Sequence, residues 1–468
     1  MSQVQPPLQF IPPALNSVVL RGCEWILPGW LHARTNISDI QADNVELLVD
    51  LYHQFQSGKI RFLIAFRHPN GEDPYSLMHL LWNLVPQVAR EKQIPLNYPT
   101  HAHFIYDRGI PLWAGSIVEW LYPRLGGTPI LRGKVDRLGL RSARELFASG
   151  NLPMMAAPEG ATNGHNEVVS PLEPGVSQLG FWCVEDILKA GREEQVLIVP
   201  IAIKYRYVRE PWDALDKLLT QLEIDSGLPV EDLNPAASIT DLTATSHSHK
   251  QHLRYRRLFR LSGHLLTRVE EFYTRFYHQT LPAASTRTAF ALPSTNEELV
   301  TRLQALQDVA LKVAEQAFNL HPKGSLIDRC RRLEQAGWDW IFREDIKNID
   351  ALPPLERGLA DRIAEEANLR MWHMRLVESF VAVTGRYVIE KPTAERFAET
   401  TLLIWDTMTK IKGGNSFKRP KLGKQRVQLT VGEPISISSR WDAYKSNRRG
   451  AVTDLTKDLQ TALEKMIS

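Results

Sequence analysis

Between residues 61 and 208, short apolar runs alternate with longer segments of helical periodicity, and this alternation limits the folds open to the chain. The apolar or alternating runs have the length of strands and span residues 62–66, 103–106, 153–157 and 196–207. Helical periodicity fills the intervals, at residues 74–90, 113–124, 140–149 and 176–189. Strands and helices that alternate in this way predict an α/β fold with a mostly parallel central sheet flanked by helices.

The chain changes character after Tyr207. Helical periodicity then dominates, with expected helices at 212–222, 250–277, 296–318, 325–336, 354–384 and 394–408. Residues 426–435 alternate strictly, as a half-buried strand does, and an amphipathic helix ends the sequence. A strand this late indicates that the chain returns to the first sheet. We therefore expect a helical lead-in at 1–60 with a helix at 39–56, an α/β core at 61–210, a large all-α insertion at 211–425, and a return strand with a C-terminal helix at 426–468.

The composition is that of an ordinary globular protein, with 468 residues, 43% of them hydrophobic and 23% charged. The formal net charge of +3 is too small to predict a nucleic-acid partner, and we expect none. The three cysteines, Cys23, Cys183 and Cys330, give no disulfide framework and no metal-ligand spacing, which fits a reducing compartment. We find no signal peptide and no apolar run of the ~20 residues that cross a bilayer, so we expect a cytoplasmic protein that is peripheral on a membrane.

A histidine and an aspartate, His68 and Asp73, follow the first apolar run and precede a helical pattern. The run predicts a buried strand, which places His68 at the carboxyl end, where open α/β sheets hold their ligands. An imidazole that titrates near neutral pH, with a carboxylate to fix its tautomer, is a minimal general base for a hydroxyl. The structural alternative is that Asp73 before Pro74 is the N-cap of the helix and that His68 is a polar loop residue.

Three further segments carry groups that could join such a site. Residues 126–134 combine glycines with Arg132, which can donate two hydrogen bonds to phosphate or carboxylate oxygens; a surface turn with a solvated arginine is the alternative. Residues 157–164 are rich in turn formers and include Glu159, whose carboxylate could bind an acceptor hydroxyl or simply stand in a turn. Pro200 interrupts the strand expected at 196–207, which indicates a bulge or the wall of a site.

Taken in order, these segments resemble the four motifs of the glycerolipid acyltransferase family, the enzymes that acylate glycerol phosphate and lysophosphatidic acid. The matching stretches are His-x-x-x-x-Asp at 68–73, a Gly-rich segment ending in arginine at 127–132, Pro-Glu-Gly at 158–160 and Val-Pro-Ile at 199–201. A late Val-Gly-x-Pro-Ile strand of the family is similar to residues 431–435. The resemblance covers about residues 60–208 and 426–440 and implies an acyltransferase-like α/β fold for them.

The resemblance implies an enzyme similar to 1-acylglycerol-3-phosphate O-acyltransferases. Such an enzyme moves a fatty acyl group from an acyl-ACP or acyl-CoA thioester to a lipid acceptor, here lysophosphatidic acid or a related lysophospholipid. His68 would take the proton from the acceptor hydroxyl while Asp73 orients the imidazole, and no metal or organic cofactor is expected. The residues implied to bind substrate are Gly127, Arg132, Lys134, Glu159, Gly160, Thr162 and Asn163, and those implied to form a wall of the site are Val199, Pro200 and Ile201.

The chain departs from the family's third motif, because Ala161, Thr162 and Asn163 stand where Thr-Arg-Ser is usual. One phosphate-binding arginine is therefore missing, and the candidates to replace it are Arg132, Lys134, Arg137 and Arg141. Two alternatives follow. The acceptor could lack a phosphate, as diacylglycerol, a glycolipid or a long-chain alcohol does, or the protein could be a non-catalytic lipid-binding scaffold on a membrane.

Two basic stretches are candidates for contact with a membrane surface. The first is the run of lysines and arginines at 410–426, which could lie on anionic lipid or form a solvated loop. The second is the group Arg254, Arg256, Arg257 and Arg260, which with Tyr255 and Phe259 predicts a basic interfacial helix.

Overall fold

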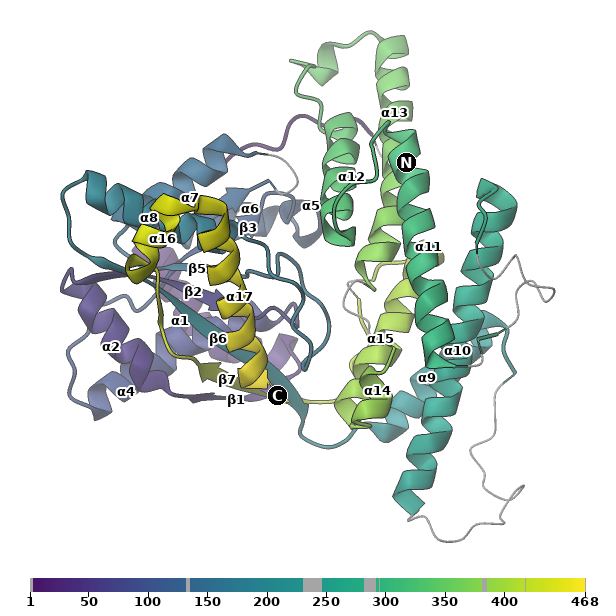
Figure 1. Ribbon diagram of the computed structural model, residues 1–468, viewed down its shortest axis with the longest axis horizontal. Coiled ribbons are helices and arrows are strands. Elements are labelled where there is room, and N and C mark those ends of the chain that lie inside the picture. The colour runs from purple at the N-terminus through teal and green to yellow at the C-terminus, as the bar shows by residue number, and fades with distance from the viewer. Residues whose placement is uncertain are drawn as a thin grey trace. The chain divides into compact units, whose positions relative to one another are not determined.

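The computed structural model describes residues 3–131, 135–229, 246–281, 292–293, 295–380, 385–416 and 418–467, and it divides into two compact units (Figure 1). One unit comprises Leu8–Val208 together with Lys424–Ser468 and contains the sheet; we call it the α/β unit. The other comprises Met1–Pro7 and Arg209–Gly423, and we call it the helical unit. The predicted insertion, 211–425, differs from the long segment of the helical unit by two residues at each end.

The α/β unit is built on an eight-stranded sheet in the order β1-β7-β6-β2-β5-β3-β4, with β8 pairing with β6. Strand β7 runs antiparallel to β6 and parallel to β1, and β8 is antiparallel to β6, while the other neighbours are parallel. The mostly parallel sheet flanked by helices is therefore confirmed. The strands are β1 Ile37–Asp43, β2 Ile60–Phe66, β3 His103–Asp107, β4 Gly127–Ile130, β5 Met154–Ala156, β6 Gln195–Tyr207, β7 Gln425–Val431 and β8 Ile435–Ser436.

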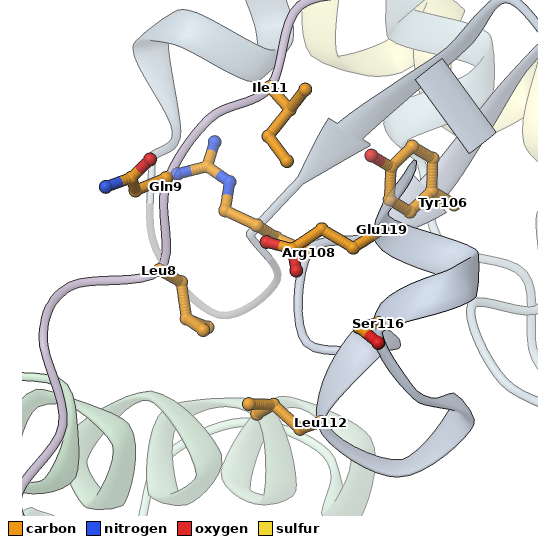
Figure 2. A pocket seen from close by; sticks show the side chains of 8 residues that line it. All are labelled: Leu8, Gln9, Ile11, Tyr106, Arg108, Leu112, Ser116 and Glu119. Atoms are coloured by element: carbon orange, nitrogen blue, oxygen red, sulfur yellow. The ribbon is translucent and has the colours of Figure 1, made fainter. Parts of the chain in front are cut away.

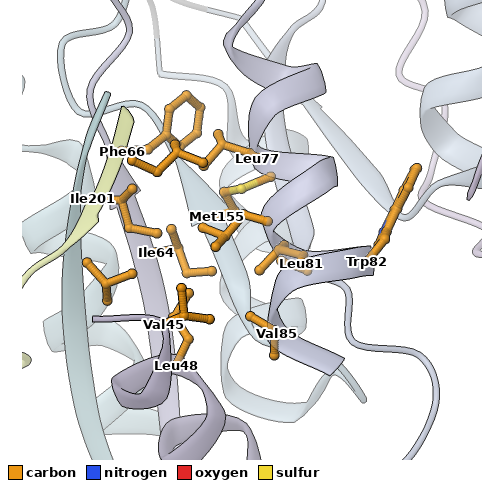
Figure 3. Close-up of a cluster of buried hydrophobic side chains, with 14 of the residues drawn as sticks. Val45, Leu48, Ile64, Phe66, Leu77, Leu81, Trp82, Val85, Met155 and Ile201 are labelled. Carbon is orange, nitrogen blue, oxygen red and sulfur yellow. The ribbon is translucent and has the colours of Figure 1, made fainter. Parts of the chain in front are cut away.

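Helices cover both faces of this sheet, because alternate side chains of its central strands point to opposite sides. Phe62, Ile64 and Phe66 of β2 pack with α1, α2, α3, η1 and α4, as Figure 3 shows for part of this cluster, while Leu63 and Ala65 pack with α7, α8, α16 and α17. Burial of each large apolar side chain contributes about 1.5–3 kcal/mol. The helices are α1 Ser17–Arg34, α2 Val45–Gln56, α3 Asp73–His79, the π-helix η1 Leu80–Leu84, α4 Val85–Glu91, α5 Pro111–Ala114, α6 Ser116–Arg124, α7 Arg137–Ser149, α8 Gly175–Lys189, the 3₁₀ turn η5 Ser438–Arg440, α16 Trp441–Ser446 and α17 Arg448–Ile467.

The region expected to be a helical lead-in contains an edge strand of the sheet, so that prediction is wrong in part. Strand β1, Ile37–Asp43, occupies the start of the helix predicted at 39–56, and the helix begins only at Val45. Asn44 separates the two because its φ of 59° lies in the left-handed region, and its side chain donates a hydrogen bond to the carbonyl of Val431 at 3.0 Å. Residues from Leu8 onward thus belong to the α/β unit.

The helical unit is a helical assembly around its own apolar core, which gathers residues of α10, α11, α12 and α13. The first residues of the chain join it, since the Gln5 N–H donates to the carbonyl of Ile341 at 2.8 Å. Its helices are α9 Trp212–Ser226, α10 Ser246–Tyr277, α11 Asn296–Ala317, α12 Leu326–Ile341, the 3₁₀ turn η4 Ile349–Ala351, α13 Pro354–Glu378, α14 Tyr387–Glu390 and α15 Ala394–Ile411.

The basic group on α10 is only partly at the surface, which corrects part of the prediction made for it. Arg254 pairs with Asp216 at 2.7 Å and Arg257 with Glu223 at 2.6 Å, and both guanidinium groups are largely buried. Arg254 and Arg257 therefore join α10 to α9, whereas Arg256 is exposed. Among the helices that the structure describes, none is long and apolar enough to cross a bilayer.

Candidate active site

The imidazole of His68 and the carboxylate of Asp73 are in direct contact at the carboxyl end of β2. Nδ1 of His68 lies 2.8 Å from Oδ2 of Asp73. The Asp73 side chain is completely buried, whereas 23% of the His68 side chain is exposed. The imidazole also packs edge-on against the ring of Phe66, with centroids 5.8 Å apart. The pair thus has a buried acceptor on one side and an open edge on the other.

Two further donors hold the Asp73 carboxylate. The Asn70 N–H donates to Oδ2 at 2.9 Å, and the hydroxyl of Tyr205, on β6, donates to Oδ1 at 2.6 Å. Burial raises the pKa of Tyr205 well above its usual value, and the adjacent Asp73 charge adds to this, so the phenol stays a donor. The Asp73 carboxylate acts as a hydrogen-bond acceptor in all of these contacts. Nδ1 of His68 therefore carries the proton, and Nε2 presents its lone pair.

The structural alternative for Asp73, that of a helix N-cap, does not hold. Helix α3 begins at Asp73 itself, Glu72 is the N-cap residue, and no side-chain cap bond is formed. The carboxylate instead accepts from Asn70, which precedes the helix. Within the described ranges Nε2 of His68 has no hydrogen-bond partner, so it is available to a hydroxyl.

Glu159 holds the backbone of His68 and is not exposed to a substrate. Its Oε1 accepts the His68 N–H at 2.9 Å, and its Oε2 accepts the Ser170 N–H at 2.9 Å and the Asn163 amide at 2.8 Å. The side chain is fully buried, and Nε of Arg67 lies 3.6 Å from Oε1. Glu159, which was expected to bind the acceptor, instead supports the backbone of the segment that carries His68.

The loop after β5 is tied to the ends of β2 and β6 by two buried side chains. The guanidinium group of Arg67 donates to the carbonyls of His165 at 2.7 Å, of Val168 at 2.6 Å and of Asn166. The amide of Asn166 accepts from the Tyr205 N–H at 2.7 Å and donates to the Tyr205 carbonyl at 3.1 Å. These contacts hold the backbone on both sides of Asp73, so that His68 and Tyr205 can both reach its carboxylate.

The other residues predicted at residues 157–164 lie beside this network. Asn163 supports the loop, since its N–H donates to the His68 carbonyl at 3.3 Å and its amide also donates to the Val168 carbonyl at 2.6 Å. Gly160 has a φ of 71°, and a Cβ there would overlap the carboxylate of Glu173. Thr162 is exposed.

The Gly-rich segment has a different structure from the turn considered for it. Gly127 starts strand β4 and is buried; a Cβ there would come within 2.7 Å of the Phe104 ring. The strand was not predicted because it is short and contains both glycine and proline. The two basic residues expected to anchor a phosphate, Arg132 and Lys134, lie outside the described residues.

The Val199-Pro200-Ile201 segment is a regular part of β6, so the bulge expected there is absent. The three residues pair with Ile64, Ala65 and Phe66 of β2 without a register shift. Pro200 is tolerated because its nitrogen faces the interval between β7 and β8, where its carbonyl accepts the Gly432 N–H at 2.9 Å. Val199 and Ile201 are completely buried, so they support the site from the core and do not form an exposed wall.

A pocket of about 190 Å³ lies at the carboxyl end of β3, two strands from β2 (Figure 2). This separation is about 10 Å along the sheet edge. Arg108 lines the pocket, and its guanidinium group is ion-paired with Asp136 while its buried Nε has no partner in the described part of the chain. The remaining lining residues are Leu8, Gln9, Ile11, Tyr106, Leu112, Ser116 and Glu119.

The sequence did not point to several residues that build this site. Tyr205 and Asn166 lie far from His68 along the chain and have ordinary strand and loop surroundings. The role of Arg67 could have been predicted, because a charged residue directly after a buried strand needs buried hydrogen-bond partners.

Comparisons with protein-family models, with curated proteins and with solved structures give no match for this chain, so its function has to be inferred from its own residues.

Proposed function

We propose that the protein is an O-acyltransferase with an acyltransferase-like α/β unit. It would move a fatty acyl group from an acyl-ACP or acyl-CoA thioester to a glycerolipid hydroxyl, with lysophosphatidic acid or a related lysophospholipid as the first candidate acceptor. The observation that carries the proposal is the His68–Asp73 pair, in which Nδ1 is held by a buried carboxylate at 2.8 Å and Nε2 is open. The sequence motifs supply the reaction class, and this geometry is what the reaction requires.

The chemistry uses His68 as base and then as acid. Nε2 takes the proton of the acceptor hydroxyl as its oxygen attacks the thioester carbonyl, and Asp73 stabilises the imidazolium that forms. The new C–O bond replaces the C–S bond, and the departing thiolate takes the proton back from His68. The products are an ester and a free thiol, and the reaction consumes only the thioester and the hydroxyl.

A phosphate headgroup on the acceptor would need positively charged side chains at the carboxyl edge of the sheet. The arginine usual in the third motif is replaced in the Ala161-Thr162-Asn163 stretch, and Arg108, at the same edge, is already paired with Asp136. An uncharged acceptor, such as diacylglycerol, a glycolipid or a long-chain alcohol, is therefore the second candidate. A non-catalytic lipid-binding scaffold is the remaining alternative.

A panel of substrates separates these possibilities. Purified protein would be incubated with acyl-ACP and acyl-CoA, each with lysophosphatidic acid, diacylglycerol, a glycolipid and a long-chain alcohol, and ester formation would be followed by mass spectrometry. We expect ester with at least one pair and strong preference within the acceptors. Absence of ester with every pair would leave the scaffold as the function, and turnover of uncharged acceptors alone would remove the phosphate-binding role of Arg132.

A further inference from the structure

Helix α1, Ser17–Arg34, is apolar on two opposite faces. One face carries Leu20, Leu27 and Leu31, which are buried in the core of the α/β unit. The other carries Val18, Trp25, Ile26 and Trp30, which are exposed, Val18 to 80% and Trp25 to 85%. At 3.6 residues per turn these four positions fall on one side of the helix. We call this set the outer face of α1.

The neighbouring helix adds more exposed apolar surface. Backbone N–H groups of Ala14 and Asn16, just before α1, donate to the carbonyls of Pro123 and Arg124 at the end of α6, each at 2.8 Å. Helix α6 exposes Ile117 to 74% and also exposes Trp120. Single exposed apolar residues are common. A group of this size, with three tryptophans, indicates a surface that binds a membrane or another protein.

Arginines border this surface. Arg21 lies over the ring of Tyr98 at 4.9 Å, Arg34 lies over Trp30 at 5.9 Å, and Arg124 lies over Trp120 at 4.4 Å. On α1 the single carboxylate, Glu24, is directed to the hydroxyl of Tyr98, at 3.2 Å. Tryptophan beside arginine is the composition of protein surfaces at the level of lipid headgroups, where indole rings sit at the interface and cations meet anionic phosphates.

The outer face is continuous with the candidate site. Trp30 packs against Tyr75 of α3 with ring centroids 6.1 Å apart, and Tyr75 lies two residues after Asp73. The N–H of Asn36, just after α1, donates to the carboxylate of Glu72 at 3.2 Å. A partner that covers the outer face therefore lies beside the turn that holds His68.

We infer that the outer face of α1 docks on the surface of a lipid bilayer that contains anionic headgroups. A second copy of the chain fits less well, because a two-fold contact through this face would place the same arginines of both copies near one another. The choice of lipid rests in part on the proposed function, whose acceptor is a lipid. Docking through α1 would bring a membrane-embedded hydroxyl to the side of the sheet where His68 lies.

Vesicle flotation of the full-length protein tests this inference without any acyl transfer. The probes are vesicles of phosphatidylcholine alone and of phosphatidylcholine mixed with phosphatidylglycerol. We expect the protein to float with the mixed vesicles, and the variant Trp25→Glu/Ile26→Glu to bind at least about 10-fold more weakly, because two interfacial side chains are lost. A matched control, Leu188→Glu/Trp340→Glu, changes one exposed aliphatic residue and one exposed tryptophan elsewhere and should float like the wild type.

Three results would overturn the inference: no flotation of the wild type, equal flotation of the α1 variant, or a wild-type dimer in sedimentation equilibrium that the α1 variant dissociates without any vesicle binding. The His68→Ala variant separates this test from that of the proposed function. It should float like the wild type whether or not the protein transfers acyl groups. Circular dichroism of the variants shows that a loss of binding is not a loss of fold.

Discussion

At the scale of single residues, Asp73 is the centre of the candidate site. It is buried and accepts hydrogen bonds from the imidazole of His68, the backbone of Asn70 and the hydroxyl of Tyr205. A buried carboxylate is stable only when such donors replace the water that it has lost. The donor most distant in sequence is Tyr205, 132 positions away, which makes the site dependent on the register of β6.

Replacement of Tyr205 by phenylalanine should destabilise the protein more than the same change at Tyr52. Both tyrosines are buried, but Tyr205 donates to a carboxylate, whereas Tyr52 donates to the backbone carbonyl of His101 at 3.0 Å. We expect Tyr205→Phe to lower the free energy of unfolding by about 1.5–3 kcal/mol and Tyr52→Phe by about 0.5–1.5 kcal/mol. Urea unfolding measures both values, and equal losses would show that Tyr205 does not support a charged Asp73.

The buried imidazole of His101 should make the α/β unit sensitive to acid. Its Nδ1 accepts from the indole of Trp82 at 3.1 Å and its Nε2 donates to the Leu125 carbonyl at 2.9 Å, so it is neutral. Burial lowers the pKa of His101 to about 4. Because this pKa is below that of the unfolded chain, the stabilisation is complete above pH ~6.5 and is lost as the pH falls toward 4.

The loss from His101 alone should reach about 3 kcal/mol. The variant His101→Gln cannot titrate but keeps a donor and an acceptor in similar positions. Between pH ~6.5 and ~4 its free energy of unfolding, measured with urea, should fall less than that of the wild type. Equal slopes in the two proteins would assign the acid sensitivity to other groups.

At the scale of elements, the loop between β5 and α8 holds the backbone of His68 through Glu159. Glu159 accepts the His68 N–H, and Gly160, next in the chain, adopts a left-handed φ of 71°. Gly191 offers a matched comparison, with a φ of 67° and nothing within 4 Å of the position of a Cβ. The two glycines therefore separate backbone strain from overlap with a neighbour.

We expect Gly191→Ala to cost about 1–2 kcal/mol of unfolding free energy from left-handed strain alone. Gly160→Ala should cost more, because its Cβ also overlaps the carboxylate of Glu173. Chemical denaturation of both variants measures the difference. If Gly160→Ala were no worse than Gly191→Ala, the loop would have room to move and would not hold His68 firmly.

Helices and strands with a strong hydrophobic periodicity could be predicted from the sequence. Elements and contacts that depend on distant parts of the chain could not. The apolar run of β2 and the five-residue spacing of His68 and Asp73 are local signals, and the structure brings these two side chains together. Strand β1 was missed because only part of its surface is buried and its sequence continues into a helical pattern. The hydrogen bond from Tyr205 to Asp73 could not be predicted from the sequence, because it depends on the pairing of β6 with β2.

At the scale of the whole molecule, the helical segment 209–423 leaves and re-enters the sheet at neighbouring positions. The last pair of the β6–β7 ladder joins Tyr207 to Gln425, and the Val208 N–H donates to the Lys424 carbonyl at 2.9 Å. Strands β6 and β7 can therefore pair up to the two points at which this segment begins and ends. The residues of the candidate site all come from the α/β unit. The central proposal concerns that unit, and it depends on His68 as a base.

The most direct test compares acyl transfer by the wild type with that by His68→Ala. His53→Ala is the matched control, because His53 lies exposed on α2 of the same unit. With the best donor and acceptor of the panel, we predict that His68→Ala lowers the rate of ester formation by about 10²–10⁴-fold, while His53→Ala leaves it unchanged. A wild type that forms no more ester than His68→Ala would show that His68 is not the base of an acyl transfer.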